Sequence, residues 1–334
     1  MKKYILLFLL VLFARAFTPA QAQAQPRALG LELENFPYPY PVHFLHLTLQ
    51  GQPLKMAYMD VRPARPNGHT VVLLHGKNFS GAYWDSTARS LSANGYRVIL
   101  PDQVGFGKSS KPAHLQYSFP LLARNTALLL DSLQINKVAV LGHSMGGMLA
   151  ARFALMYPER VEQLILENPL GLEDYKLNVP YQTVDEFYKS ELKQDAAKIK
   201  AYQLENYYGG RWQPQYDKWV NMLAGWTLNP KYGVIAWNAA LTYDMILTQP
   251  VYYELDRIQA PTLLIIGQRD RTSVGKALAP AAIRPSLGNY PELGRTTQQR
   301  IKGATLVAID NVGHLPHIES FDKFIGPLLD FLKK

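Results

Sequence analysis

Ser144 lies at the centre of a Gly-x-Ser-x-Gly sequence, residues 142–146, and has the chemistry of a nucleophile. A serine hydroxyl is a weak nucleophile at neutral pH and needs a base to take its proton during attack. Histidine suits that role because its ordinary pKa lies near neutrality. A carboxylate must then hold the imidazole in the correct tautomer and stabilise its cation. The chain has eight histidines and 26 acidic residues from which the base and the carboxylate could come.

The residues around Ser144 predict a strand, a sharp turn and a helix in succession. The apolar run Lys137–Leu141 precedes the turn, and a helix rich in small residues follows through Ala150 and Ala154. Such a turn holds the serine in a strained conformation, so neighbouring positions need glycine to avoid clashes. It also places Ser144 at a helix N-terminus, where backbone N–H groups favour a developing negative charge. This context favours a nucleophile over a chance match.

The elements that must position these residues alternate between short apolar runs and helix-length segments. Continuous apolar strands between helices predict a mostly parallel central sheet, buried on both faces and flanked by helices. His43–Gln50 and Leu54–Val61 predict a hairpin turning at Gly51, which makes the sheet mixed. The fold class is therefore α/β. The six predicted parallel strands are Thr70–Leu74, Arg97–Leu100, Lys137–Leu141, Gln163–Leu166, Thr262–Ile266 and Ala304–Ile309.

The alternation is interrupted between residues 169 and 256, which predict helices. Thr183 and Glu186 have the spacing of a capping box, and apolar residues then recur every three or four positions from Val184 to Tyr202. The segment also holds four of the five tryptophans. We interpret residues 169–256 as a helical cap over the site, inserted between two parts of a core, residues 25–168 and 257–334. Ordinary helical packing is the alternative explanation for these aromatic residues.

On these motifs and their order, the chain resembles the α/β-hydrolase superfamily over nearly its whole mature length. The resemblance implies a triad of Ser144, Asp270 and His314, and an oxyanion hole built from the backbone N–H groups of Lys77 and Met145. Further matching motifs are His75-Gly76-Lys77-Asn78 in the oxyanion loop, Asp102–Ser109 with the pattern Asp-x-x-Gly-x-Gly-x-Ser, Gly267–Asp270 at the position of the triad acid, and Gly313-His314 at that of the base.

Several assignments stay open at this stage. Glu167 competes with Asp270 for the role of triad acid, because some members of the superfamily place the acid there. The side chain of Lys77, where many relatives carry a small residue, could enter the site or turn to solvent. Residues 271–303 exceed the length of one crossover helix and are rich in proline and glycine, which predicts irregular chain. His75, His143, His317 and Asp102 are expected to have structural roles.

Residues 1–24 have the pattern of a secretory signal peptide, with Lys2 and Lys3 before an apolar stretch and small residues at Ala22 and Ala24. Arg15 ends the apolar stretch too early for a membrane span. We therefore expect an exported protein, periplasmic or secreted, without a stable membrane anchor. The chain has no cysteine, so we expect no disulfides.

The formal charge of +9 drops to +6 without the three basic residues of that leader, and the remaining basic residues are scattered. We expect no nucleic-acid binding. Gly107-Lys108-Ser109 resembles a phosphate-binding loop, but Asp102 stands where that loop needs glycine. The sequence also has no metal-ligand spacing, so we expect no cofactor and no metal.

A serine at the turn predicts acyl transfer to a small-molecule substrate. We expect hydrolysis of a carboxylic ester through an acyl-enzyme intermediate. The alternatives are a carbon–carbon bond hydrolase, another serine-dependent member of the superfamily, or a receptor that keeps the triad without turnover.

Overall fold

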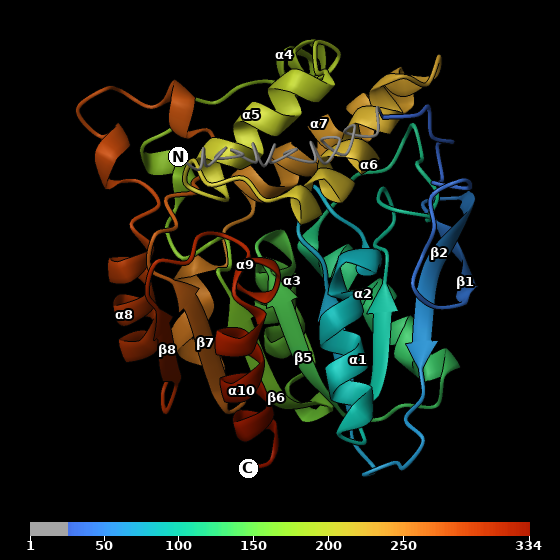
Figure 1. Cartoon of the computed structure of the whole chain (residues 1–334), viewed down its shortest axis with the longest axis vertical. Helices are drawn as coiled ribbons and strands as arrows, with labels where there is room; N and C mark the ends of the chain where they lie inside the picture. The colour runs from blue at the N-terminus through green and yellow to red at the C-terminus, as the bar shows by residue number, and fades with distance from the viewer. Residues whose placement is uncertain (1–25) are drawn as a thin grey trace, which may run out of the picture.

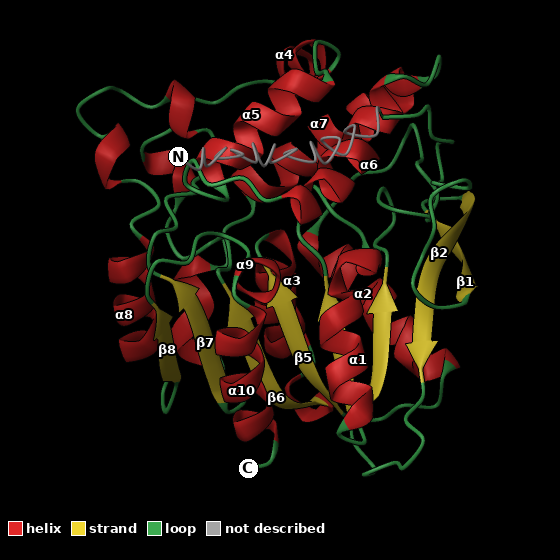
Figure 2. Cartoon of the chain, in the orientation of Figure 1, coloured by secondary structure: helices red, strands yellow, loops and turns green. Residues whose placement is uncertain are grey.

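The computed structural model describes residues 26–334. The predicted signal peptide lies outside the described residues. An eight-stranded sheet, in the order β1-β2-β4-β3-β5-β6-β7-β8, forms the centre of the molecule (Figures 1 and 2). β1 pairs with β2 and β2 with β4 in antiparallel fashion, and all other pairs are parallel. The predicted mixed α/β fold is confirmed. The strands are β1 (Val42–Leu49), β2 (Gln52–Val61), β3 (Thr70–Leu74), β4 (Arg97–Pro101), β5 (Val138–His143), β6 (Val161–Glu167), β7 (Thr262–Gly267) and β8 (Thr305–Ile309).

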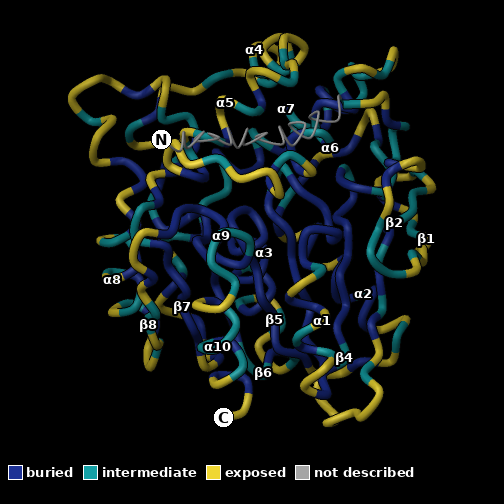
Figure 3. Tube along the Cα trace, viewed as in Figure 1, coloured by how far each residue is buried: buried dark blue, intermediate teal, exposed yellow. Residues whose placement is uncertain are grey.

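Helices cover both faces of the sheet, and a hydrophobic cluster fills the space on each side. Alternation along β3 shows the division: Val72 and Leu74 belong to the cluster under α2 and α3, whereas Val71 and Leu73 belong to the cluster under α1 and α10. The inner strands β3 to β7 are accordingly buried along most of their length, whereas the edge strands β1 and β8 are more exposed (Figure 3). The helices around the sheet are α1 (Asp85–Ala93), α2 (Phe119–Ser132), α3 (Met145–Met156), α8 (Tyr290–Arg300), α9 (Pro316–Glu319) and α10 (Phe321–Leu332).

Four further helices follow β6 and lie over the carboxyl ends of the parallel strands (Figure 1). They are α4 (Val184–Glu191), α5 (Ala196–Asn206), α6 (Asp217–Thr227) and α7 (Tyr232–Thr248). The chain also forms short 3₁₀ turns, which are Gly81–Trp84, Pro158–Arg160, Tyr175–Leu177, Pro214–Tyr216, Tyr252–Arg257, Lys276–Leu278 and Arg284–Ser286. We call residues 169–256 the helical insertion. Within residues 26–334, no helix is both long and apolar enough to cross a membrane.

The predicted capping box is present, but the helix that it starts is shorter than the apolar spacing indicated. The Thr183 hydroxyl accepts the N–H of Glu186, and the Glu186 carboxylate accepts the N–H of Thr183 at 2.8 Å. The helix ends at Glu191, and Asp195 caps a second helix by accepting the N–H of Lys198 at 2.8 Å. The continuous period was therefore misleading: α4 packs against α7 and has no buried residue, whereas α5 packs against α6 and buries Ile199.

Residues 271–303 are irregular only in their first part. Two 3₁₀ turns precede α8, which includes Pro291 and Gly294 against the expectation of irregular chain. Pro291 lies in the first turn, where a missing N–H removes no intrahelical hydrogen bond. A Cβ at Gly294 would lie 3.1 Å from Ile266, so the glycine lets α8 approach β7 closely. Both residues are thus compatible with α8, and neither interrupts it.

The first described residues connect the helical insertion to the core. The backbone of Leu29 bonds to Gly225 at 2.9 Å, and the Trp226 indole donates to Gly30 at 3.0 Å. Further along, the Tyr38 hydroxyl donates to the Asp102 carboxylate at 2.6 Å. One side of the insertion is therefore held to the loop after β4.

Candidate active site

Ser144 occupies a strained turn between β5 and α3, as the sequence predicted. Its φ of 57° lies in a region that residues with a side chain rarely adopt. The flanking glycines are required by close contacts: a Cβ at Gly142 would lie 2.0 Å from the Gly146 carbonyl oxygen, and one at Gly146 would lie 2.1 Å from that of Leu74. The surrounding packing therefore holds the serine in its strained conformation.

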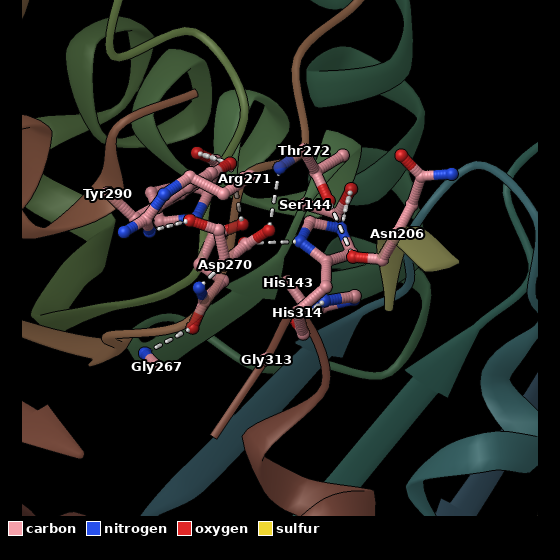
Figure 4. Close-up of polar contacts among 12 residues, drawn as sticks. His143, Ser144, Asn206, Gly267, Asp270, Arg271, Thr272, Tyr290, Gly313 and His314 are labelled. Carbon is pink, nitrogen blue, oxygen red and sulfur yellow. Dashed lines mark hydrogen bonds and ion pairs between the residues drawn. The ribbon is translucent and has the colours of Figure 1, made fainter. Parts of the chain in front are cut away.

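The structure brings Ser144, His314 and Asp270 into direct contact (Figure 4). His314 Nε2 lies 3.0 Å from Ser144 Oγ, and His314 Nδ1 lies 2.7 Å from Asp270 Oδ2. Asp270 is fully buried, and the exposed fractions of His314 and Ser144 are 1% and 7%. If Nδ1–H donates to the carboxylate, Nε2 accepts the serine hydroxyl, which is the arrangement that general-base catalysis requires.

The Asp270 carboxylate is held in place by two neighbours besides His314. Its Oδ2 accepts an N–H of the Asn168 amide at 2.7 Å, and its Oδ1 accepts the backbone N–H of Thr272 at 2.8 Å. Asn168 in turn accepts the backbone N–H of Gly267 at 2.8 Å. Sequence reasoning missed Asn168, although its place directly after β6 could have suggested it.

Glu167 contacts a different histidine. Its Oε1 accepts both the backbone N–H and the Nδ1–H of His317, each at 2.8 Å. The His317 ring stacks on Trp84, with 4.2 Å between ring centroids. Among the hydrogen bonds and ion pairs of residues 26–334, none joins Glu167 to His314, so of the two candidate acids Asp270 is the one bonded to it.

Asp102 and His75 order loops near the site. Asp102 accepts the backbone N–H groups of Gly81 and Lys108, each at 2.7 Å. His75 contacts the carbonyl of Gly76 at 2.9 Å and accepts the N–H of Gln103 at 3.0 Å. Both therefore have the structural roles that the sequence indicated.

His143 does more than fill space beside the nucleophile. Its Nε2 lies 2.7 Å from the His314 carbonyl oxygen, and its Nδ1 lies 3.0 Å from the Tyr83 hydroxyl. That hydroxyl accepts the backbone N–H of Gly76 at 2.9 Å. Burial lowers the pKa of His143 well below its usual value, which keeps the ring neutral. A hydrogen-bonded chain thus joins the loop after β3 to the backbone of His314, and the sequence indicated neither this chain nor Tyr83.

The two predicted oxyanion donors belong to segments that adjoin Ser144. Met145 begins α3, where first-turn N–H groups have no partner within the helix. Lys77 lies in the turn that the Phe79 N–H to Gly76 carbonyl bond closes at 3.1 Å. A Cβ at Gly76 would lie 3.2 Å from Ser144 Cβ, so this turn packs directly against the nucleophile.

A cavity of about 1180 Å³ opens onto Ser144 and His314. The helical insertion contributes much of its wall, and residues 271–278 contribute another part. Of the four tryptophans of the insertion, only Trp226 lines the cavity. Trp219 packs against Phe79 and Tyr83, and Trp237 donates to the Ala113 carbonyl. Most of these rings are thus packing residues.

The side chain of Lys77 enters this cavity. Its ammonium lies 5.5 Å from the centroid of the Phe187 ring on α4. Burial lowers the pKa of Lys77. Residues 26–334 contain no group of three or more His, Asp or Glu side chains that could hold a metal ion.

The chain belongs to the α/β-hydrolase fold family, whose model matches residues 69–321. With the names of its relatives, this makes the protein a hydrolase. A probable hydrolytic enzyme of known structure from Pseudomonas aeruginosa is 52% identical, with a TM-score of 0.92, and the match covers 93% of this chain and 100% of that one.

Two sequence relatives have more specific names. A 2-hydroxy-6-oxononadienedioate/2-hydroxy-6-oxononatrienedioate hydrolase from Burkholderia vietnamiensis is 28% identical over 317 residues, which cover 87% of this chain and 95% of the relative. A 2-hydroxy-6-oxo-6-phenylhexa-2,4-dienoate hydrolase from Burkholderia cepacia is 41% identical over 108 residues. That second match covers 31% of this chain and only 38% of the relative.

Proposed function

We propose that this hydrolase cleaves a carboxylic ester through an acyl-enzyme intermediate formed on Ser144. The observation that carries the proposal is the contact of His314 with both Ser144 and Asp270, at 3.0 and 2.7 Å. A buried histidine placed between a hydroxyl and a carboxylate can take the serine proton and remain stabilised while it carries it. The open cavity beside Ser144 leaves room for the acyl group.

The proposed reaction has two halves. Ser144 Oγ attacks the carbonyl carbon while its proton passes to His314 Nε2; the bond to the leaving oxygen then breaks, and that oxygen takes the proton from Nε2. Water next attacks the acyl-enzyme with His314 again as base, which releases the acid and restores the serine. In both halves the N–H groups of Lys77 and Met145 would stabilise the oxyanion, and one such donor is worth about 3 kcal/mol of the barrier.

The helical insertion, in this proposal, is a cap domain that closes over the site. Its position above the strand ends and its share of the cavity wall support that role. Export to the periplasm or the medium is a further part of the proposal, and it rests on the pattern of residues 1–24 alone.

A second candidate is hydrolysis of a carbon–carbon bond next to a carbonyl group. The names of the two sequence relatives favour it, since both act on 2-hydroxy-6-oxo compounds. The same serine and histidine would serve, with the proton delivered to carbon instead of oxygen.

The test begins with a fluorophosphonate probe, which should label Ser144 in the parent and leave Ser144→Ala unlabelled. Turnover of p-nitrophenyl esters is then compared with loss of absorbance from a 2-hydroxy-6-oxo-dienoate. Faster cleavage of the dienoate than of the esters would favour carbon–carbon bond hydrolysis over ester hydrolysis. A burst of product without turnover on either substrate would mean that the protein is a receptor.

A further inference from the structure

The cavity beside Ser144 has a marked excess of basic side chains. Six basic residues and only two acidic ones, Glu191 and Glu205, line it among the residues that the structure describes. A pocket with this balance raises the local concentration of anions. The basic residues are Lys77, Lys198, Arg269, Arg271, Lys276 and Arg284.

Five of these six cations already have partners in the protein. Lys198 pairs with Asp195 at 3.3 Å, and Arg269 pairs with Glu319. The other three donate to backbone carbonyl oxygens of the 271–289 segment or its neighbours: Arg271 to Gln268 and Asp270, Lys276 to Arg271 and Leu287, and Arg284 to Ala277 and Ala279.

Lys77 differs from the other five. No hydrogen bond or ion pair holds its ammonium within the part of the chain that the structure describes, and the ammonium lies over the face of the Phe187 ring. Phe187 is itself fixed by stacking on Tyr243, at 3.8 Å between centroids. Glu191 acts on Lys77 through space but forms no ion pair with it. Lys77 therefore presents three free N–H donors to the cavity.

We propose that the Lys77 ammonium binds a carboxylate of the substrate, so that the enzyme prefers acyl compounds that carry a second, negatively charged group. This inference rests on the proposed function, because it assumes that the substrate reacts at Ser144. A cation removed from water and left unpaired is costly, and a bound carboxylate would compensate that cost. Lys77 and Ser144 line the same cavity, so one molecule could reach both.

The experiment compares pairs of esters that differ by one charge. The first pair, p-nitrophenyl pentanoate and the p-nitrophenyl monoester of glutarate, places the carboxylate on the acyl side. The second pair, phenyl pentanoate and 3-carboxyphenyl pentanoate, places it on the leaving group. The measured quantity is the ratio of kcat/KM for the charged ester to that for the neutral ester in each pair.

The parent should favour the charged member of one pair, and that pair identifies the side of the substrate that Lys77 binds. Lys77→Met should lower this ratio by about tenfold or more, mainly through KM, as expected for losing a hydrogen bond to a charged group. Lys77→Arg should retain most of the ratio. Lys198→Met is the matched control, because Lys198 lines the same cavity but is already paired, and its ratio should stay within about twofold of the parent.

Equal turnover of both members in both pairs by the parent, or an unchanged ratio in Lys77→Met, would overturn the inference. Inhibition of the parent by free glutarate, compared with pentanoate, provides a measurement that needs no variant, and equal inhibition by the two acids would also count against it. Failure of the proposed function looks different: the parent would cleave no ester, and the fluorophosphonate probe would leave Ser144 unlabelled.

Discussion

Two acid–histidine pairs lie close together at the carboxyl edge of the sheet, and only one of them meets a nucleophile. Asp270 with His314 and Glu167 with His317 have nearly the same geometry, at 2.7 and 2.8 Å, and all four side chains are buried. His143 lies between the two rings, at 4.7 Å from His314 and 5.4 Å from His317. By geometry alone, either pair could orient a general base.

The pairs differ at the far nitrogen of each imidazole. His314 Nε2 faces Ser144 Oγ and the cavity, whereas His317 Nε2 has no hydrogen-bond partner among the described residues and its ring stacks on Trp84. A buried imidazole enclosed by aromatic rings has no route to a substrate. A carboxylate–histidine pair is thus a candidate for catalysis only where its free nitrogen reaches a nucleophile and a cavity.

The same substitution in each histidine should separate the pairs most strongly. His314→Gln should reduce ester turnover by about a million-fold, since removing the base costs about as much as removing the nucleophile. His317→Gln should leave kcat/KM within about threefold while it lowers the melting temperature. Steady-state kinetics and thermal unfolding of both variants provide the check, and a large kinetic loss in His317→Gln would contradict the comparison.

The two acids should differ in the same direction with a smaller effect. Asp270→Asn should slow turnover by about 10⁴-fold, because an amide favours the wrong imidazole tautomer. Glu167→Gln keeps the size of the side chain and should mainly destabilise the fold, by about 1–3 kcal/mol for a weakened buried contact. If Glu167→Gln were the more damaging change in kcat/KM, the triad acid would have to be reassigned.

The hydrogen-bonded chain from Gly76 through Tyr83 and His143 ends at the backbone of His314. Breaking it should therefore affect the Asp270–His314 pair, with a smaller loss of turnover than the substitutions above. Tyr83→Phe removes the hydroxyl that accepts the Gly76 N–H and contacts His143. Turnover should fall about tenfold, less than the ~10²-fold cost of deleting an oxyanion donor.

Tyr96→Phe is the matched control for that change. It also removes a buried hydroxyl, which donates to Leu332 at the other end of the chain. Equal kinetic losses in the two variants would assign the effect to general destabilisation.

Of the two histidines, only His314 reaches the cavity. Substitutions in the cavity wall should have the smallest effect on catalysis. Trp226→Ala should alter the chain-length preference on p-nitrophenyl esters from acetate to palmitate by a few-fold, because Trp226 lines the cavity. Trp237→Ala also loses one indole hydrogen bond but lies outside the cavity lining, so it should leave the preference unchanged. A shift of equal size in both variants would mean that the helical insertion has a structural role and does not set the chain-length preference.

Much of the fold and the main site residues could be predicted from sequence because their signals are local. The glycines around Ser144 and the apolar run before it indicate the strand, turn and helix without knowledge of any distant contact. The carboxyl ends of parallel strands meet at one edge, so Ser144, Glu167, Asp270 and His314 could be expected there together. That expectation places both acids at the edge but does not choose between them.

The tertiary structure decided what depends on contacts between distant segments. The order β5-β6-β7-β8 and the path of each loop after its strand bring Asp270 to His314 and leave Glu167 with His317. The direction of the Lys77 side chain follows from the position of Phe187 on α4, which is more than a hundred residues away in sequence. Local propensity carries no information on such pairs, because the free energy that selects them comes from packing the whole sheet, its loops and the helical insertion together.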